Sequence, residues 1–280
     1  MQTYSVVGGG GVRLNVVETG NPSGQAILLI HGFSGSRLVW MKQLESDLPN
    51  DFRLVAMDIR GHGLSDKPRD AYGDARLWAD DIQAVIGTLG LDQPILSGWS
   101  YGGVIIADYV RVHGEERIGG LHLVGACTKL GDPLMRFAGP QFGAVVPGMF
   151  SNDVEVMIDT LPRFLRLLVN TELSPTDLSF FLGICAMVPP YVRQGLFSRT
   201  VDNDDLLPTI RKPVLITHGE ADIVLLPEMA QHHAAKMPHA QLSWFPNAGH
   251  TPHWEDPQRF NIALREFAER VAASRGALAT

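Results

Sequence analysis

Short apolar runs alternate along this chain with segments in which apolar residues recur every three or four positions. Short apolar runs are typical of strands buried on both faces of a parallel sheet. They occupy residues 26–30, 53–57, 93–97, 119–124, 214–217 and 242–245. Helical spacing is found at residues 38–48, 77–89, 104–112, 227–236 and 257–273. This alternation predicts an α/β fold, with a mostly parallel central sheet flanked by helices.

Two regions depart from the alternation. Residues 2–7 and 12–19 form strand-like runs around four glycines, which suit a hairpin turn that needs positive φ. Residues 131–205 contain no clear strand, but apolar residues recur at helical spacing over 154–169 and 178–187. We therefore expect an inserted helical cap at 131–205 and a core domain formed by residues 1–130 and 206–280.

The composition limits the classes of partner. Hydrophobic residues make up 45% and charged residues 19% of the 280, which is typical of a globular protein. The net charge is −7 and no Lys/Arg cluster occurs, so we expect no nucleic-acid partner. We find no secretory signal and no apolar run of membrane-spanning length, so we expect a cytoplasmic protein without a membrane partner. Cys127 and Cys185 are interpreted as buried apolar residues, and the oligomeric state is left undetermined.

The clearest chemical signal is the segment 98–102, Gly-Trp-Ser-Tyr-Gly, between a predicted strand and a predicted helix. A sharp strand-to-helix turn needs small flanking residues, and it raises its central serine above the sheet. The N–H groups at the helix start favour developing negative charge there. Ser100 is thus the candidate nucleophile.

A serine hydroxyl needs a base, and the base needs a group that orients it. His250 follows a late strand, in the order nucleophile, acid, histidine, and is the candidate base; His253 is its nearest competitor. Asp222, shortly after the strand at 214–217, is the candidate acid. Glu220 and Asp132 are alternatives. No spacing typical of a metal site occurs, so we expect neither a metal nor a cofactor.

An oxyanion hole needs two backbone N–H groups. One should come from the residue after the nucleophile, Tyr101, and the other from the loop that begins His31-Gly32-Phe33, where we select Phe33.

These motifs together resemble the α/β-hydrolase superfamily over nearly the whole chain. The resemblance also includes residues 58–65 (Asp-Ile-Arg-Gly-His-Gly-Leu-Ser), 218–222 (His-Gly-Glu-Ala-Asp) and 249–255 (Gly-His-Thr-Pro-His-Trp-Glu). It implies an α/β-hydrolase fold with an inserted cap and a Ser-Asp-His triad. In this superfamily the segment containing Asp58, Arg60 and His62 is structural.

The resemblance also narrows the reaction. Haloalkane dehalogenases and epoxide hydrolases of the superfamily carry Asp where this chain has Ser100, and C–C bond hydrolases usually extend the early loop differently. Carboxylesterases and cofactor-free haloperoxidases, better described as perhydrolases, are most similar. We expect a carboxylic-ester hydrolase acting on a small or medium apolar ester, with aromatic and methionine side chains of the cap lining its pocket. Perhydrolase, lactonase, thioesterase, C–C hydrolase and slow-turnover ligand receptor remain alternatives.

Overall fold

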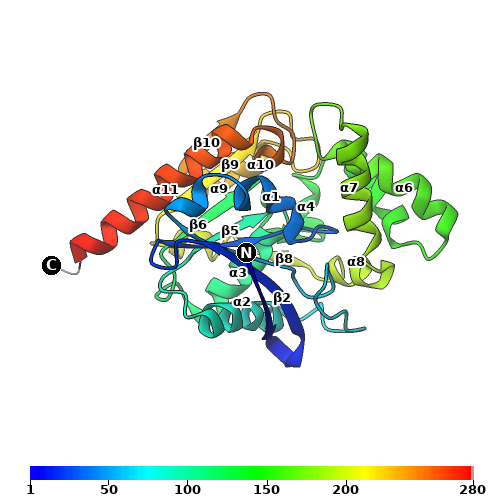
Figure 1. Cartoon of the computed structure of the whole chain (residues 1–280). Coiled ribbons are helices and arrows are strands. Elements are labelled where there is room, and N and C mark those ends of the chain that lie inside the picture. Colours follow the sequence, from blue (N-terminus) through cyan, green and yellow to red (C-terminus); the bar gives the residue numbers. More distant parts are fainter. Residues whose placement is uncertain (279–280) are drawn as a thin grey trace.

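The computed structural model describes the backbone of residues 1–278 and the side chains of residues 1–274. Eight strands form one sheet in the order β1-β2-β4-β3-β5-β6-β9-β10. The first two strands, β1 (Gln2–Val7) and β2 (Arg13–Gly20), are antiparallel to their neighbours, and every other pairing in the sheet is parallel. The predicted α/β fold class is confirmed (Figure 1).

The hairpin between β1 and β2 turns at a short 3-10 helix, η1 (Gly9–Gly11). Gly10 and Gly11 have φ of 68° and 82°, so the glycines supply the positive φ that was predicted. The turn is held to the rest of the molecule, because the Gly9 N–H donates to Asp81 at 2.9 Å.

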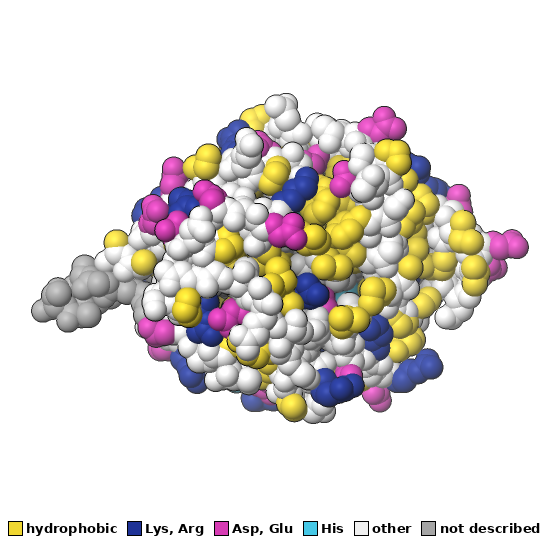
Figure 2. All heavy atoms as spheres, in the orientation of Figure 1, with side chains coloured by type: hydrophobic (Ala, Val, Ile, Leu, Met, Phe, Trp, Pro, Cys, Tyr) yellow, Lys and Arg dark blue, Asp and Glu magenta, His cyan; other side chains and the backbone are white. Residues whose placement is uncertain are grey.

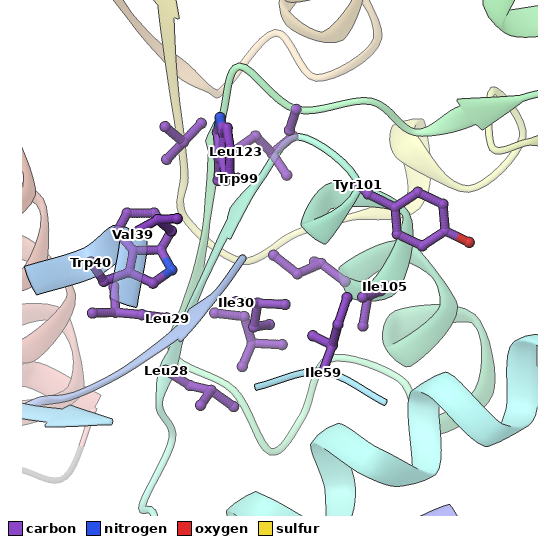
Figure 3. Close-up of a cluster of buried hydrophobic side chains, with 14 of the residues drawn as sticks. Leu28, Leu29, Ile30, Val39, Trp40, Ile59, Trp99, Tyr101, Ile105 and Leu123 are labelled. Carbon is purple, nitrogen blue, oxygen red and sulfur yellow. The ribbon is translucent and has the colours of Figure 1, made fainter. Parts of the chain in front are cut away.

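The parallel strands coincide with the apolar runs. They are β3 (Ala26–Ile30), β4 (Arg53–Met57), β5 (Ile95–Trp99), β6 (Gly120–Val124), β9 (Val214–Gly219) and β10 (Gln241–Phe245). All residues of β3, β5, β6 and β9 are buried, which is why their sequences do not alternate between apolar and polar. Figure 3 shows side chains filling both faces, with Trp40 on one side and Ile59 and Ile105 on the other.

Helices cover both faces of the sheet. On one side, α2 (Ala75–Leu89) packs against α3 (Gly102–His113); on the other lie α1 (Met41–Leu44), α10 (Pro252–Glu255) and α11 (Pro257–Leu278) (Figure 1). Helix α9 (Glu228–Lys236) packs on β9 and β10. The single helix predicted at 38–48 is wrong: the segment divides into η2 (Arg37–Trp40), α1 and η3 (Leu48–Asn50), with Pro49 inside the last.

Between β6 and β9 the chain leaves the sheet. It forms α4 (Asp132–Met135), α5 (Pro140–Val145), η4 (Val146–Phe150), α6 (Val154–Leu167), α7 (Pro175–Ala186) and α8 (Pro190–Leu196), then η5 (Leu207–Thr209) leads back to the sheet. The strands β7 (Lys129–Leu130) and β8 (Val201–Asp202) pair with each other just before α4 and just after α8, so they join the two ends of this helical segment. We keep residues 131–205 as a proposed cap and call this segment the candidate cap.

Two helices of the candidate cap begin at residues whose side chains cap the first turn. Asp153 accepts from the N–H groups of Glu155 and Val156 at the start of α6, and the Ser174 side chain accepts from Asp177 at the start of α7. Figure 1 shows α6 and α7 standing beside the sheet, away from α11.

Within residues 1–278, no helix has both the length and the apolarity needed to cross a membrane.

Candidate active site

Ser100 lies on a sharp turn between β5 and α3, with φ of 55°. The turn needs glycine on both sides. A Cβ on Gly98 would lie 2.6 Å from the Ile106 side chain, and one on Gly102 would lie 2.7 Å from the carbonyl oxygen of Ile30. Positive φ costs a non-glycine residue about 1 kcal/mol or more, so close packing must hold Ser100 in place.

The structure brings Ser100, His250 and Asp222 into one hydrogen-bonded chain. Oγ of Ser100 lies 2.9 Å from Nε2 of His250, and Nδ1 of His250 lies 2.8 Å from Oδ2 of Asp222. His250 and Asp222 are buried, whereas Ser100 is partly exposed. Because a carboxylate only accepts, Nδ1–H donates to Asp222 and Nε2 is left free to accept the Ser100 proton.

Asp222 is itself firmly oriented. Its Oδ1 accepts from the N–H groups of Val224 and Leu225 at 2.8 and 3.0 Å. His218 Nε2 lies 3.3 Å from the other oxygen, although it lies closer, at 2.9 Å, to the Leu225 carbonyl oxygen. These contacts fix the carboxylate so that Oδ2 points at His250.

The sequence-based competitors lie elsewhere. Glu220 and Asp132 are exposed to solvent. His253 is buried against Trp40 and Trp99, and in the described part of the chain neither of its ring nitrogens has a hydrogen-bond partner. Burial holds the pKa of His253 well below its usual range. None of the three is placed to serve Ser100.

The two candidate oxyanion donors flank Ser100, the candidate nucleophile. Tyr101 is the N-cap residue of α3, where N–H groups lack a partner inside the helix. Phe33 lies in the loop after β3, which comes so close to the nucleophile that a Cβ on Gly32 would lie 2.7 Å from the Ser100 Cβ. Among the residues that the structure describes, we find no hydrogen bond donated by either N–H.

The loop after β3 is supported by two buried histidines. The Ile59 N–H donates to Nε2 of His31 and the Ser34 N–H donates to Nε2 of His62, at 3.1 and 3.2 Å. Each ring must therefore carry its proton on Nδ1. Nδ1–H of His31 donates to the Gly32 carbonyl, and Nδ1–H of His62 donates to the Arg60 carbonyl. Burial lowers the pKa of both rings, so both stay neutral.

The segment 58–65 contacts the loop after β3 and the residues that follow it. Asp58 accepts from the Arg37 N–H at 2.8 Å and from the Leu64 N–H at 3.0 Å. Arg60 forms a buried ion pair with Asp81, with both oxygens at 2.7 Å. These contacts agree with the scaffold role that the resemblance implied.

A small cavity of about 20 Å³ lies beside the Ser100 hydroxyl. Its lining consists of Phe33, Trp99, Ser100, Phe142, Phe164, Leu168, Val224 and His250. Of the cap side chains that we expected to line a pocket, Phe164 does so, while others such as Phe180 and Phe181 pack against Trp254. The cavity therefore has aromatic walls and holds roughly one water-sized group.

A larger apolar cleft, of about 620 Å³, lies between α6, α7 and the start of α8. Its exposed lining includes Val154, Ile158 and Met187. Hydrophobic side chains gather over the α6–α7 side of the molecule in Figure 2. The cleft shares no lining residue with the cavity at Ser100, so only the small cavity adjoins the candidate nucleophile.

Sequence reasoning missed two supporting residues. Glu255 joins the His250 loop to the candidate cap, accepting from the Gly249 N–H at 2.8 Å and the Asn170 N–H at 2.7 Å. Arg193 of α8 donates to Ser34 in the loop after β3. Glu255 falls inside the motif 249–255 and could have been suspected, whereas nothing in the sequence around Arg193 signals its role.

Other reactive groups are not assembled into a site. Burial raises the pKa of both Cys127 and Cys185 to about 12, so neither is a thiolate at neutral pH. Among the described residues, no group of three or more His, Cys, Asp and Glu side chains is placed to hold a metal ion.

Known proteins share this architecture. Residues 25–257 match the family model described as alpha/beta hydrolase fold. The crystal structure of esterase RhEst1 from Rhodococcus sp. ECU1013 superposes with a TM-score of 0.91 and 35% identity, covering 97% of this chain and 100% of that one. A thermophilic esterase from Thermogutta terrifontis gives a TM-score of 0.80 and 26% identity over 97% of this chain and 99% of that one.

A curated relative agrees with these structures. The AB hydrolase superfamily protein YisY of Bacillus subtilis is 28% identical, over 92% of this chain and 96% of its own length. The family model covers well over half of the chain, and the esterase structures superpose on nearly the whole of this chain. The chain therefore belongs to the α/β-hydrolase family and is a hydrolase enzyme.

Proposed function

We propose that the enzyme hydrolyses carboxylic esters through an acyl-enzyme on Ser100, with His250 as general acid and base and Asp222 as the orienting acid. The observation that carries the proposal is the hydrogen-bonded chain from Ser100 Oγ through His250 to Asp222, beside the N–H groups of Phe33 and Tyr101. The esterase relatives support it.

Acylation follows from this geometry. Ser100 Oγ attacks the ester carbonyl carbon while its proton passes to Nε2 of His250. The carbonyl oxygen becomes an oxyanion, which the N–H groups of Phe33 and Tyr101 stabilise. The bond from carbon to the leaving oxygen then breaks, and the imidazolium returns its proton to that oxygen, so that an alcohol leaves and Ser100 carries the acyl group.

Deacylation repeats these steps with water. His250 takes a proton from water as the water oxygen attacks the acyl carbon, and it then protonates Oγ as the acyl–oxygen bond breaks. The carboxylic acid leaves and Ser100 is restored. Asp222 holds His250 in place and stabilises the imidazolium.

The cavity size narrows the substrate class. The space beside Ser100 is about 20 Å³, room for roughly one methyl-sized group, and it is walled by aromatic rings, which favours the shortest acyl groups. Because Ser100 is partly exposed, the alcohol or phenol portion of the ester can extend outward. We infer a preference for short-chain acyl esters of small, apolar alcohols or phenols, with the candidate cap closing over them.

The test is hydrolysis of a p-nitrophenyl ester series, from acetate to decanoate, by the wild type and by Ser100→Ala. We expect turnover above about 1 s⁻¹ on the shortest esters, with at least a thousandfold loss in the variant. Turnover that survives the Ser100 substitution contradicts the mechanism. Covalent labelling of Ser100 by a fluorophosphonate without ester turnover would instead favour a lactone, thioester or C–C substrate, or a slow-turnover receptor.

A further inference from the structure

Arg193 is a fully buried cation that reaches the loop after β3 from the cap side. Its exposed fraction is 0%, and in the described part of the chain no carboxylate forms an ion pair with its guanidinium. Nε donates to Ser34 Oγ at 2.8 Å, while the terminal nitrogens donate to the carbonyl oxygens of Met149 and Cys185 at 3.3 and 2.5 Å. One nitrogen also lies 3.6 Å from the Met157 sulfur.

These contacts join three parts of the candidate cap to one residue of the core. Met149 lies in η4, Cys185 in the last turn of α7 and Arg193 itself in α8. Carbonyl groups at a helix end lack intrahelical partners and carry partial negative charge, which suits a guanidinium. Burying a charge without a counter-ion is nevertheless costly, and an apolar side chain of similar size would usually pack better. Fastening cap elements together therefore does not by itself account for an arginine here.

The core partner, Ser34, directly follows the candidate oxyanion donor Phe33. Ser34 has φ of 55°, a conformation that a non-glycine residue holds only when its neighbours fix it. Its N–H donates to His62, its carbonyl oxygen accepts from the Cys185 thiol at 3.3 Å, and its hydroxyl accepts from Arg193. His62 thus holds the Phe33–Ser34 peptide from the core, while Cys185 and Arg193 hold the Ser34–Gly35 peptide and the Ser34 side chain from the cap. The Phe33 N–H belongs to the preceding peptide, so fixing Ser34 fixes the residue that adjoins it.

We propose that Arg193 is a positioning residue that sets the direction of the Phe33 N–H by holding the side chain of Ser34. Its effect on the reaction is indirect, since it touches neither the nucleophile nor the substrate. Because Arg193 belongs to the candidate cap, a complete oxyanion hole then depends on the cap being closed. This inference rests on the proposed function, in which the Phe33 N–H stabilises the oxyanion.

The test uses both ends of the Arg193–Ser34 bond and a matched control. Arg193→Lys keeps the positive charge but removes the guanidinium and its several N–H donors. Ser34→Ala removes only the hydroxyl that accepts from Arg193, so this second variant tests the bond even if the Arg193 variant does not fold. Tyr191→Phe is the control, because it deletes another cap–core hydrogen bond of α8, from Tyr191 to the Lys67 carbonyl at 2.9 Å, away from the loop after β3. Each folded variant is assayed for kcat, KM and the rate constant for phosphonylation of Ser100 by a fluorophosphonate.

Complete loss of one oxyanion donor typically lowers kcat by 10²–10³, so misdirecting it should lower kcat by about tenfold or more. We expect Ser34→Ala and Arg193→Lys to lower kcat and the phosphonylation rate in parallel by about tenfold, with KM within about twofold of wild type. The double variant should be no worse than either single variant, because one bond is removed twice. Tyr191→Phe should change both rates by less than about twofold.

Two results overturn the proposal. One is a folded Ser34→Ala variant whose kcat and phosphonylation rate stay within about twofold of wild type. The other is a Tyr191→Phe variant that loses as much, since that reflects general loosening of the cap. Phosphonylation separates this inference from the proposed function: a wild type that is labelled at Ser100 but turns over no ester refutes the ester proposal, and the labelling rates still decide the role of Arg193. A wild type that is not labelled refutes both.

Discussion

A Cβ placed on Gly32 would lie 2.7 Å from the Cβ of Ser100 and 3.3 Å from its hydroxyl oxygen. Real Cβ atoms do not approach that closely, so a side chain at residue 32 must displace either the nucleophile or the loop after β3. Glycine is needed here for close approach, because in the proposed mechanism the loop brings the Phe33 N–H to the carbonyl that Ser100 attacks.

Gly32→Ala should therefore lower kcat by about 100-fold or more while the protein remains folded, because a misplaced oxyanion donor costs rate and overpacking costs about 1–3 kcal/mol of stability. Ester kinetics and thermal unfolding measure the two effects. Gly87→Ala is the control: among the described residues, no atom outside the neighbouring backbone of α2 lies within 4 Å of its Cβ position, so activity should be unchanged and stability should rise slightly. Equal kinetics for the two variants would contradict the argument.

Asp222→Asn should lower kcat by about 10³–10⁴ with little change in KM. The amide cannot stabilise the imidazolium, and its NH₂ group favours the wrong tautomer of His250. Glu220→Gln tests the competing carboxylate, which is exposed, and should leave kcat within about twofold. If the larger loss followed the Glu220 substitution, our assignment of the acid would be wrong.

Arg60→Met should destabilise the fold by about 3–5 kcal/mol, because it leaves the buried Asp81 carboxylate without its cation. Burial already raises the pKa of Asp81 despite the two hydrogen bonds from Arg60, which indicates how costly that charge is to bury. Urea unfolding measures the change. The matched variant is Arg163→Met, whose exposed pair with Asp159 should contribute less than about 1 kcal/mol.

The sequence predicted those features that depend on local pattern. Buried parallel strands have unbroken apolar sequences, and the Gly98–Gly102 pattern stands between a predicted strand and a predicted helix, so the sheet and the Ser100 turn were both foreseeable. The His250 and Asp222 loops followed from chain order, because parallel strands end at one edge of the sheet.

Features that depend on distant packing could not be predicted. Arg193 lies 159 positions from Ser34, and no local rule indicates that a buried arginine of α8 will reach that loop. Helical periodicity at 38–48 suggested one helix, but the segment is divided into three short pieces packed against β3, β4 and α10. The aromatic side chains of the candidate cap were similarly ambiguous, because an apolar helix face fits a substrate pocket and a core equally well.

The buried histidines should make stability fall in mild acid. Burial lowers the pKa of His122 and His233 to about 3, whereas an unfolded chain has a histidine pKa near 6.5. Their contribution is therefore complete above about pH 6.5 and is lost as the pH falls toward the folded value, because only the unfolded state takes up protons in that window. At pH 5.5 each such histidine should cost about 1.4 kcal/mol relative to pH 7.5.

Urea unfolding of the wild type and of His122→Gln at pH 7.5 and 5.5 measures this cost. The glutamine can still bond Ser97 and Thr217, the present partners of His122, but it does not titrate. The loss of stability between the two pH values should be about 1.4 kcal/mol smaller in the variant. The control is His239→Asn, which removes an exposed histidine. Its free energy of unfolding should fall between pH 7.5 and pH 5.5 by the same amount as that of the wild type. Identical pH dependence in all three proteins would show that His122 is not held neutral.

Phe164 should set the acyl-chain limit, because its ring closes the cavity beside Ser100. It meets the Phe33 ring edge-on at 5.9 Å between centroids and lies 6.3 Å from that of Phe142. Phe164→Ala removes this wall, so longer acyl chains gain apolar contact worth about 0.8 kcal/mol for each buried methylene group. The ratio of kcat/KM for the octanoate ester to that for the acetate ester should rise by at least about tenfold. Phe180→Ala, a cap truncation that leaves the cavity lining intact, should reduce stability without changing that ratio, and a change of equal size there would mean that chain-length selection does not lie in the small cavity.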